Sequence, residues 1–392
     1  MKSEWRMMKL GDMCKISSSK RIFAKEYCGD GIPFYRGKEI IEKHKGYAVS
    51  TELFISEERY EQIKEQFDVP KIGDILLSSV GTLGIPWLVD EEKFYFKDGN
   101  LTWLRAGKGL DNKFLYLWLC SPEAKRQIDA KCIGSTQKAI TIQALNKFDI
   151  RIPDIDTQRK ISDLLFTINN KINLNDKMNR NLKQQLHTFY MKMFTESAMD
   201  AVLGDVVVTT SGGTPSRKHG EYYDHGNICW VKSKELCGDY LHDTEEHINE
   251  LAIAKSSAKL LPSHSVLIAM YGATVGAYGI ISQPMACNQA VCAVLSNEKY
   301  PYTYLFQVVC ESQQILINLA VGSAQQNISQ VLIKQLPIHS NENIIQKFHT
   351  LARPIHEKLE TFQDENRHLA EMRDCLLPKL MSGELDVSSL DL

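Results

Sequence analysis

Five short motifs occur twice in this chain, in the same order and about 190 residues apart. The pairs are Leu10-Gly11-Asp12 and Leu203-Gly204-Asp205, 34–40 and 230–236, 55–57 and 248–250, 81–84 and 272–276, and 134–140 and 322–328. Ordered self-similarity at one long spacing is typical of a tandem duplication. The repeat therefore predicts two similar globular domains rather than one large one.

Each globular half mixes strand-like and helix-like segments. The apolar runs at 73–80 and 264–271 are typical of buried strands, and each ends at a glycine turn. Segments 113–132 and 301–320 are expected to be helical, and Ser56 and Asn249 stand where helix N-caps are expected. Since no regular βαβ alternation is visible, we expect an α+β fold, that is, mixed α/β, in each half.

Two long helices are predicted, one after each globular half. Apolar residues recur at steps of four and three from Ile161 to Met193 and again from Ile345 to Leu380. The seams predict an antiparallel coiled coil in which Asn175, Asn179 and Asn366 fix the register, and they imply a pseudo-twofold axis. Pro354 is predicted to begin or to kink the second helix. The alternative is two amphipathic helices that cover separate cores.

These patterns give a division into five segments. We expect a first globular domain at 1–155, a central helical spacer at 156–198, a second globular domain at 199–340, a distal helical spacer at 341–384 and a tail at 385–392.

Several kinds of chemistry are absent from the sequence. It has no Walker phosphate loop, no Pro-Pro dipeptide as an Asn/Asp-Pro-Pro-Tyr methyltransferase motif requires, and no H-E-x-x-H pair. None of the ten cysteines forms a C-x-x-C pair, so we expect reduced, buried thiols and no metal site. His242 and His247 are assigned to a solvated acidic loop. We therefore predict no catalytic residues.

Charge and hydropathy indicate in which compartment the chain is expected and which ligands suit it. No run of 18 apolar residues is present and the first nine residues have no apolar core, so we expect a cytoplasmic protein with no signal peptide or membrane span. The formal net charge of −2 does not by itself indicate a nucleic-acid binder. Nucleic-acid binding would need local basic patches or a basic partner.

Two similar domains on a helical spacer fit a ligand that has its own dyad symmetry, such as duplex DNA. Basic and polar loops at matched places are the candidate contacts, among them 17–21 with 211–218. The pair Arg36 and Lys38 matches Lys232 and Lys234, and the alternative for these cations is salt bridges to Glu39 or Glu235. The predicted DNA-contacting residues are Lys20, Arg21, Arg36, Lys38, Ser78, Ser79, Thr82, Ser135, Gln137, Lys138, Thr214, Ser216, Arg217, Lys218, Lys232, Lys234, Tyr271, Thr274, Ser323, Gln325 and Gln326.

The repeat separates these residues into two groups. Residues that both halves share cannot distinguish two half-sites, so the G-S-x-Q segments at 134–137 and 322–325 are predicted to be structural or to face phosphates. Residues that differ at matched places are predicted to read bases, as in 78–80 against 269–271 and in 22–29 against 219–225.

These motifs resemble the specificity subunits of type I restriction–modification systems over essentially the whole chain. The resemblance rests on L-G-D near the start of each half, S-G-G-T-P-S-R-K at 211–218, G-D-I-L-L-S-S-V-G-T-L-G at 73–84, G-S-T-Q-K-A-I-T-I-Q-A-L at 134–145 and I-R-I-P-D-I-D-T-Q-R-K-I at 150–161. The matching junction at 338–348 lacks the proline of I-P-D-I-D, which leaves the start of the second long helix open.

The resemblance implies a DNA-recognition function without catalysis. Each domain would read half of a bipartite double-stranded target, and the helices would set the spacing and help to dock two methyltransferase subunits. Restriction subunits would join the complex. S-adenosylmethionine, ATP and Mg would be used by those partners for adenine methylation and cleavage, with no cofactor bound by this chain. The alternatives are a coiled-coil scaffold that binds other proteins, and an enzyme with an unrecognised site.

Overall fold

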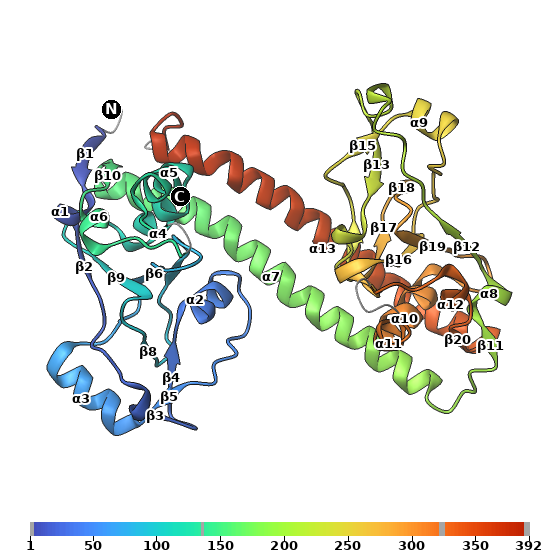
Figure 1. Ribbon diagram of the computed structural model, residues 1–392, viewed down its shortest axis with the longest axis horizontal. Coiled ribbons are helices and arrows are strands. Elements are labelled where there is room, and N and C mark those ends of the chain that lie inside the picture. Colours follow the sequence, from blue (N-terminus) through green and yellow to red (C-terminus); the bar gives the residue numbers. More distant parts are fainter. Residues whose placement is uncertain (1–3, 135–136, 321–325, 388–392) are drawn as a thin grey trace. The chain divides into compact units, whose positions relative to one another are not determined.

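The computed structural model describes residues 4–134, 137–320 and 326–387. The chain divides into two compact units, one made of 1–173 with 369–392 and the other of 174–368. Each unit holds one globular part and a section of two long helices, which Figure 1 labels α7 and α13.

The first unit is built on two small sheets. One has the order β2 (Cys14–Ser17), β9 (Leu101–Ala106), β6 (Ile75–Ser78) and β7 (Pro86–Leu88), and its paired strands are antiparallel. The other has the order β3 (Tyr27–Cys28), β5 (Phe54–Ile55), β4 (Ile32–Tyr35) and β8 (Tyr95–Phe96), with β4 and β8 parallel. A separate pair joins β1 (Arg6–Lys9) to β10 (Asp149–Ile152). The helices are α1 (Leu10–Met13), α2 (Gly37–His44), α3 (Glu57–Phe67), α4 (Asn112–Cys120), α5 (Pro122–Lys131) and α6 (Ile142–Asn146).

The second unit repeats this plan. Its larger sheet has the order β12 (Val208–Ser211), β19 (Val291–Leu295), β16 (Val266–Ala269), β17 (Tyr278–Ile281) and β14 (Tyr240–Leu241). Its smaller sheet has the order β15 (His247–Ile248), β13 (Ile228–Val231) and β18 (Ala286–Cys287), with β13 and β18 parallel. A separate pair joins β11 (Ala201–Val202) to β20 (Pro337–Ile338). The helices are α8 (Leu203–Val206), α9 (Glu250–Lys255), α10 (Tyr302–Glu311), α11 (Gln313–Asn318) and α12 (Gln330–Lys334).

The duplication read from the sequence is confirmed at the level of single hydrogen bonds. Leu10 N donates to Phe148 O at 2.9 Å, and its counterpart Leu203 N donates to Leu336 O at the same distance. The predicted caps also form, because Ser56 Oγ accepts from Arg59 N and Asn249 Oδ1 accepts from Ala252 N in the first turn of α9. Each globular part is therefore a mixed α/β fold, as predicted.

The glycine turns after β6 and β16 need a left-handed backbone. Gly81 has φ of 80° and Gly84 of 74°, and Gly272 and Gly276 have 73° and 77°. This region is open to glycine and disfavoured for other residues. The resemblance between 81–84 and 272–276 in the sequence therefore reflects the same turn in both halves.

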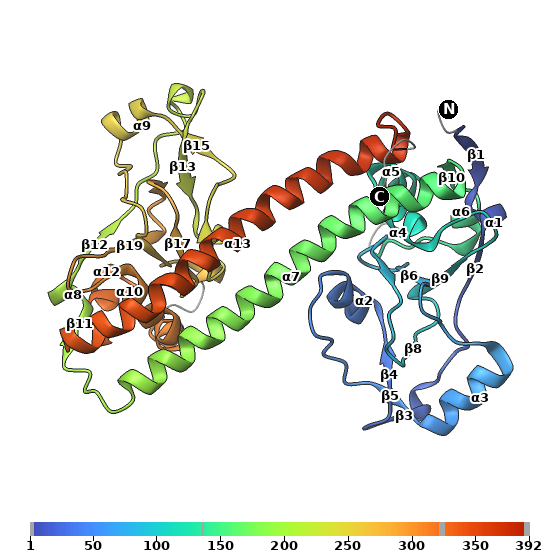
Figure 2. The same cartoon turned by 180° about the vertical axis from the view of Figure 1, so that it is seen from behind.

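The two long helices are α7 (Ile155–Phe194) and α13 (Glu342–Ser382). In the second unit Asn175 contacts Asn366, while Phe194, later in α7, contacts Phe348, earlier in α13, so the helices run in opposite directions. In the first unit Ile161 and Leu165 of α7 share a core with Leu377 and Leu380 of α13. Figure 2 shows the two helices side by side within each unit. The predicted antiparallel pairing is confirmed.

Two sequence-based expectations need correction. Since α13 begins at Glu342, Pro354 lies inside the helix and does not begin it. All ten cysteines are free, but Cys14, Cys229, Cys287 and Cys292 alone are buried, whereas Cys237 and Cys375 are exposed. The thiols are therefore not uniformly buried. Within the described residues, no helix combines the length and the apolar character needed to cross a membrane.

Candidate nucleic-acid interface

In the first unit, the glycine turn after β6 pairs with the segment that follows the G-S-T-Q motif. Gly81 N donates to Lys138 O at 3.0 Å, and Ile140 N donates to Ser79 O at 2.9 Å. Val80 and Ala139 form an isolated antiparallel bridge between these donors. Thr82 and Lys138, both predicted to contact DNA, are thereby held at one edge of the sheet.

The second unit builds the same arrangement. Gly272 N donates to Gln326 O at 3.0 Å, Ile328 N donates to Met270 O at 2.8 Å, and Tyr271 bridges to Asn327. Thr274 and Gln326 therefore occupy the places of Thr82 and Lys138. The predictions at Ser135, Ser323 and Gln325 fall outside the described residues.

A surface hollow of about 410 Å³ in the first unit gathers several predicted contacts. Its lining residues are Arg36, Gly37, Lys38, Ile41, Val80, Thr82 and Asn100. Lys38 Nζ lies 3.7 Å from Glu42 Oε1, and its side chain keeps 57% of its surface exposed. The hollow thus combines two cations with the hydroxyl of Thr82, a donor set suited to phosphate oxygens or base edges.

Glu39 and Glu235, which occupy matched positions in the two halves, accept hydrogen bonds from backbone amides. Glu39 Oε2 accepts from Arg36 N and Glu235 Oε2 from Lys232 N, each at 2.7 Å. Glu39 is fully buried, and its Oε1 also accepts from Arg36 Nη2 at 2.9 Å. Each glutamate satisfies an orphan donor at the start of a helical turn. Arg36 therefore forms the salt bridge to Glu39 that the sequence offered as the alternative to a DNA contact.

The basic residues of the second unit have acidic partners that the sequence did not reveal. Glu246 forms salt bridges with both Arg217 and Lys232, and Glu245 forms one with Lys234, whose Nζ lies 2.5 Å from Glu245 Oε2. Hydrogen bonds from these lysines lower the pKa of both carboxyl groups. An acidic pair on the loop between β14 and β15 thus partly neutralises the predicted contacts.

Aromatic rings hold Arg217 in place. Its guanidinium lies 4.3 Å from the ring centroid of Tyr223 and 5.5 Å from that of Trp230. A polar hollow of about 390 Å³ is lined by Arg217, Tyr223, Gly226, Glu245, Glu246 and His247. The two units therefore differ in charge at their hollows.

The remaining predicted contacts lie on the surface with modest restraints. Arg21 Nε donates to Asp98 Oδ2 at 2.7 Å, and Lys20 Nζ lies 4.6 Å from the centroid of Phe67. The hydroxyl of Thr214 contacts the side chain of Gln289. Residues Gln137, Lys138, Ser216 and Lys218 are exposed, and Thr274 is partly exposed.

The prediction that Ser78 and Ser79 read bases is wrong. Their exposed fractions are 0% and 3%. Ser78 Oγ accepts from Ile85 N at 2.9 Å, and Ser79 Oγ hydrogen-bonds Thr102 Oγ1 at 2.5 Å. Both hydroxyls are used inside the protein because the strand is buried on both faces. Tyr271 differs, since 41% of it is exposed.

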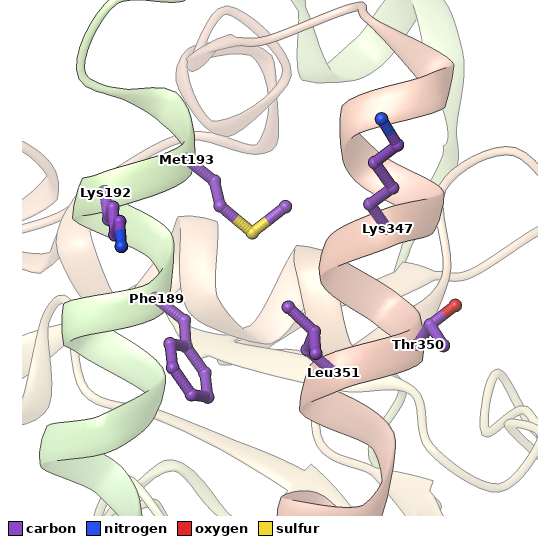
Figure 3. A pocket seen from close by; sticks show the side chains of 6 residues that line it. All are labelled: Phe189, Lys192, Met193, Lys347, Thr350 and Leu351. Carbon is purple, nitrogen blue, oxygen red and sulfur yellow. The ribbon is translucent and has the colours of Figure 1, made fainter.

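The paired helices of the second unit carry an apolar hollow of about 620 Å³ (Figure 3). Phe189 and Met193 of α7 and Leu351 of α13 line it, with Lys192, Lys347 and Thr350 at its margin. Leu351 is 49% exposed. Phe189 and Met193 belong to the predicted seam of α7, whereas Leu351 lies outside the seam of α13, so the periodicity alone did not predict the hollow that the three residues line together.

Known proteins place this fold in a defined class. A family model described as the type I restriction modification DNA specificity domain matches residues 2–184 and 198–347. The chain therefore belongs to that family of DNA specificity domains, and the two matched stretches correspond to the duplication. The resemblance inferred from the motifs is confirmed.

The relatives are specificity subunits. The type I restriction enzyme MjaIX specificity subunit of Methanocaldococcus jannaschii is 23% identical, and the match covers 99% of this chain and 95% of that protein. The EcoR124I/EcoR124II specificity subunit of Escherichia coli is 24% identical, covering 63% of this chain and 65% of that protein. The chain has the function of a specificity subunit of a type I restriction–modification system.

A solved structure confirms the fold. The type I restriction–modification S subunit from M. genitalium superposes with a TM-score of 0.66, covering 96% of each chain at 15% identity.

Proposed function

We propose that each globular part reads one half of a bipartite sequence in double-stranded DNA. The observation that carries this proposal is the matched edge in each unit, where a left-handed glycine turn pairs with the residues that directly follow the G-S-x-Q segment. The same backbone frame presents Thr82 and Lys138 in one unit and Thr274 and Gln326 in the other. A shared frame with different side chains supports two independent half-sites.

The chain itself supplies recognition and not chemistry under this proposal. Methyl transfer to adenine and ATP-dependent cleavage belong to two methyltransferase subunits and to restriction subunits in the cytoplasm. S-adenosylmethionine, ATP and Mg are then bound by those partners, with no catalytic cofactor held here. The purified chain without partners should transfer no methyl group from S-adenosylmethionine to target DNA.

The apolar hollow beside α7 and α13 supports docking of a methyltransferase subunit. Phe189, Met193 and Leu351 offer a contiguous apolar surface, and Lys192 and Lys347 add positive charge at its margin. An interface needs such a desolvated centre with a polar rim. Leu351→Asp should weaken association with the methyltransferase while leaving the fold intact, since Leu351 is half-exposed.

The decisive experiment is exchange of one recognition domain. Residues 199–339 are replaced by the matching segment of a relative with a different target, and methylation is mapped in the complex with the methyltransferase. One half of the target should change and the other should stay. A change in both halves, or binding that does not depend on sequence, would contradict the proposal and favour a scaffold that binds proteins alone.

A further inference from the structure

Three side chains of different chemistry converge at one edge of the smaller sheet in the second unit. Cys229 of β13 and His247 of β15 are register partners on adjacent antiparallel strands. Asp243 lies on the loop that leads from β14 to β15. The thiol of Cys229, one carboxylate oxygen of Asp243 and a ring nitrogen of His247 all lie within 4.8 Å of one another.

Two of the three distances between the ligand atoms are close to those around a tetrahedral ion. Cys229 Sγ lies 3.6 Å from Asp243 Oδ1, and His247 Nε2 lies 2.8 Å from the same oxygen. A tetrahedral zinc ion with bonds of 2.0–2.3 Å separates its ligand atoms by about 3.3–3.6 Å. The sulfur–oxygen distance already matches, and the nitrogen–oxygen contact has to open by about 0.5 Å.

We propose that Cys229, Asp243 and His247 form a zinc-binding site, with water as the fourth ligand. A thiolate and an imidazole select zinc over magnesium or calcium, which prefer oxygen ligands alone. The site does not depend on the proposed DNA recognition. It replaces the expectation, drawn from the absence of a C-x-x-C pair, that this chain has no metal site.

The side chains around Cys229 favour the protonated thiol when no metal is bound. Burial and, secondarily, the negative charge of Asp243 raise the pKa of Cys229, so the free thiol stays protonated at neutral pH. A cation between the sulfur and the carboxylate reverses this balance, because it offsets the charge of Asp243 and binds the thiolate. Zinc binding at this site therefore releases a proton.

The ion would fix a loop that carries two charged residues. Thr244 N donates to Asp243 Oδ1 at 2.8 Å, which orients the carboxylate toward the strand pair. Glu245 and Glu246 follow directly and bind Lys234, Lys232 and Arg217. A metal that ties Asp243 and His247 to Cys229 closes both ends of this short acidic segment.

The test uses the full chain after treatment with a strong chelator. Zinc content is measured after equilibrium dialysis, and cobalt(II) is added in parallel because a cobalt–thiolate bond gives a near-ultraviolet charge-transfer band. We expect one equivalent of zinc and a cobalt–thiolate band. Cys229→Ser should abolish the band, and Asp243→Asn and His247→Gln should weaken binding by ~10-fold or more.

Matched controls come from the same unit. Cys237→Ser removes an exposed thiol whose Sγ lies 3.8 Å from Asp239 Oδ2 but which belongs to no cluster of three metal ligands among the described residues. His225→Gln removes a histidine outside the cluster. Both control variants should still bind one equivalent of zinc and show the cobalt–thiolate band.

Two results would overturn the proposal. One is the absence of bound zinc and of the band in the unmodified chain. The other is equal binding in the cluster variants and the controls, which would leave only the hydrogen bond between His247 and Asp243. Asp243 and His247 are partly exposed, so their variants should fold, and unchanged circular dichroism checks this.

Discussion

Asn175 Nδ2 donates a hydrogen bond to Asn366 Oδ1 across the paired helices of the second unit, at 2.9 Å. Asn175 is 2% exposed, so the pair lies where the seam would otherwise be apolar. The same amide also donates to Glu365 Oε2 at 2.8 Å, and Asn366 Nδ2 donates to Asp176 Oδ1 at 2.7 Å. A polar pair of this kind, with Asn175 buried and Asn366 partly buried, has its hydrogen bonds in one register of the helices and loses them in others.

Substitution of Asn175 should therefore destabilise the second unit. Asn175→Ala leaves the partly buried amide of Asn366 with one partner fewer, and we expect a loss of about 1–3 kcal/mol in the free energy of unfolding. Urea denaturation followed by helical circular dichroism measures it. Asn181→Ala, at an exposed position of α7, is the control and should change stability by less than about 0.5 kcal/mol. Equal effects of the two substitutions would mean that the pair of Asn175 and Asn366 contributes nothing to stability.

His356 should make the second unit sensitive to acid. Burial lowers the pKa of His356 to about 3, and its Nδ1 lies 2.9 Å from Tyr240 Oη. The unfolded chain binds a proton near the ordinary value of 6.5, whereas the folded chain does not until about 3. Stability is therefore lost as pH falls below about 6.5, by at most about 1.4 kcal/mol per pH unit from this group.

The measurement is the unfolding free energy between pH 7 and 4.5. Other titratable groups around His356 are His264, His349, Glu357, Glu360, Tyr240 and Tyr302, so the slope is compared between variants rather than read alone. His356→Phe should lower the slope, and His225→Gln, at a surface loop, should not. An unchanged slope in His356→Phe would show that this histidine does not control the response.

Lys38 is expected to contact phosphate. Lys38→Gln should weaken binding to target and non-target DNA alike and reduce the slope of log affinity against log salt by ~1. Lys45→Gln, at an exposed lysine just beyond α2 and outside the hollow, is the control. Binding is measured with the methyltransferase present, over several salt concentrations. A loss confined to the target sequence would instead assign Lys38 to base reading.

Tyr271 and Ser79 should behave differently, although both were predicted to read bases. Tyr271→Ala should alter preference at one base position by ~1–3 kcal/mol, because its side chain is exposed beside the glycine turn. Ser79→Ala removes a buried hydrogen bond to Thr102 and should cost about 1 kcal/mol of stability with no change in preference. Binding to all single-base variants of the target separates the two. A changed preference in Ser79→Ala would restore the original assignment.

Glu246 should restrain DNA binding by the second unit. Glu246→Gln frees Arg217 and Lys232 from their carboxylate partner, so we expect tighter binding to all sequences and a steeper dependence on salt. Glu250→Gln, at the exposed first turn of α9, is the matched control. Weaker binding in Glu246→Gln would show that the carboxylate positions the two cations rather than neutralising them.

The sequence alone determined the features that depend on local pattern. The repeat of short motifs gave two mixed α/β parts, and the four–three spacing of apolar residues gave two long helices that pair in opposite directions. These predictions succeeded because helical periodicity, glycine turns and N-caps such as Ser56 depend on residues close together in the chain.

The tertiary structure alone decided how side chains distant in sequence meet. Ser79 faces Thr102 inside the first unit, Glu246 faces Arg217 and Lys232, and Cys229 faces Asp243 across 3.6 Å. No local pattern reports such contacts, because they depend on which strands pair and in which register. A one-residue change of register would turn Cys229 away from His247 and Asp243, so the chemistry of that edge belongs to the fold and not to any single segment.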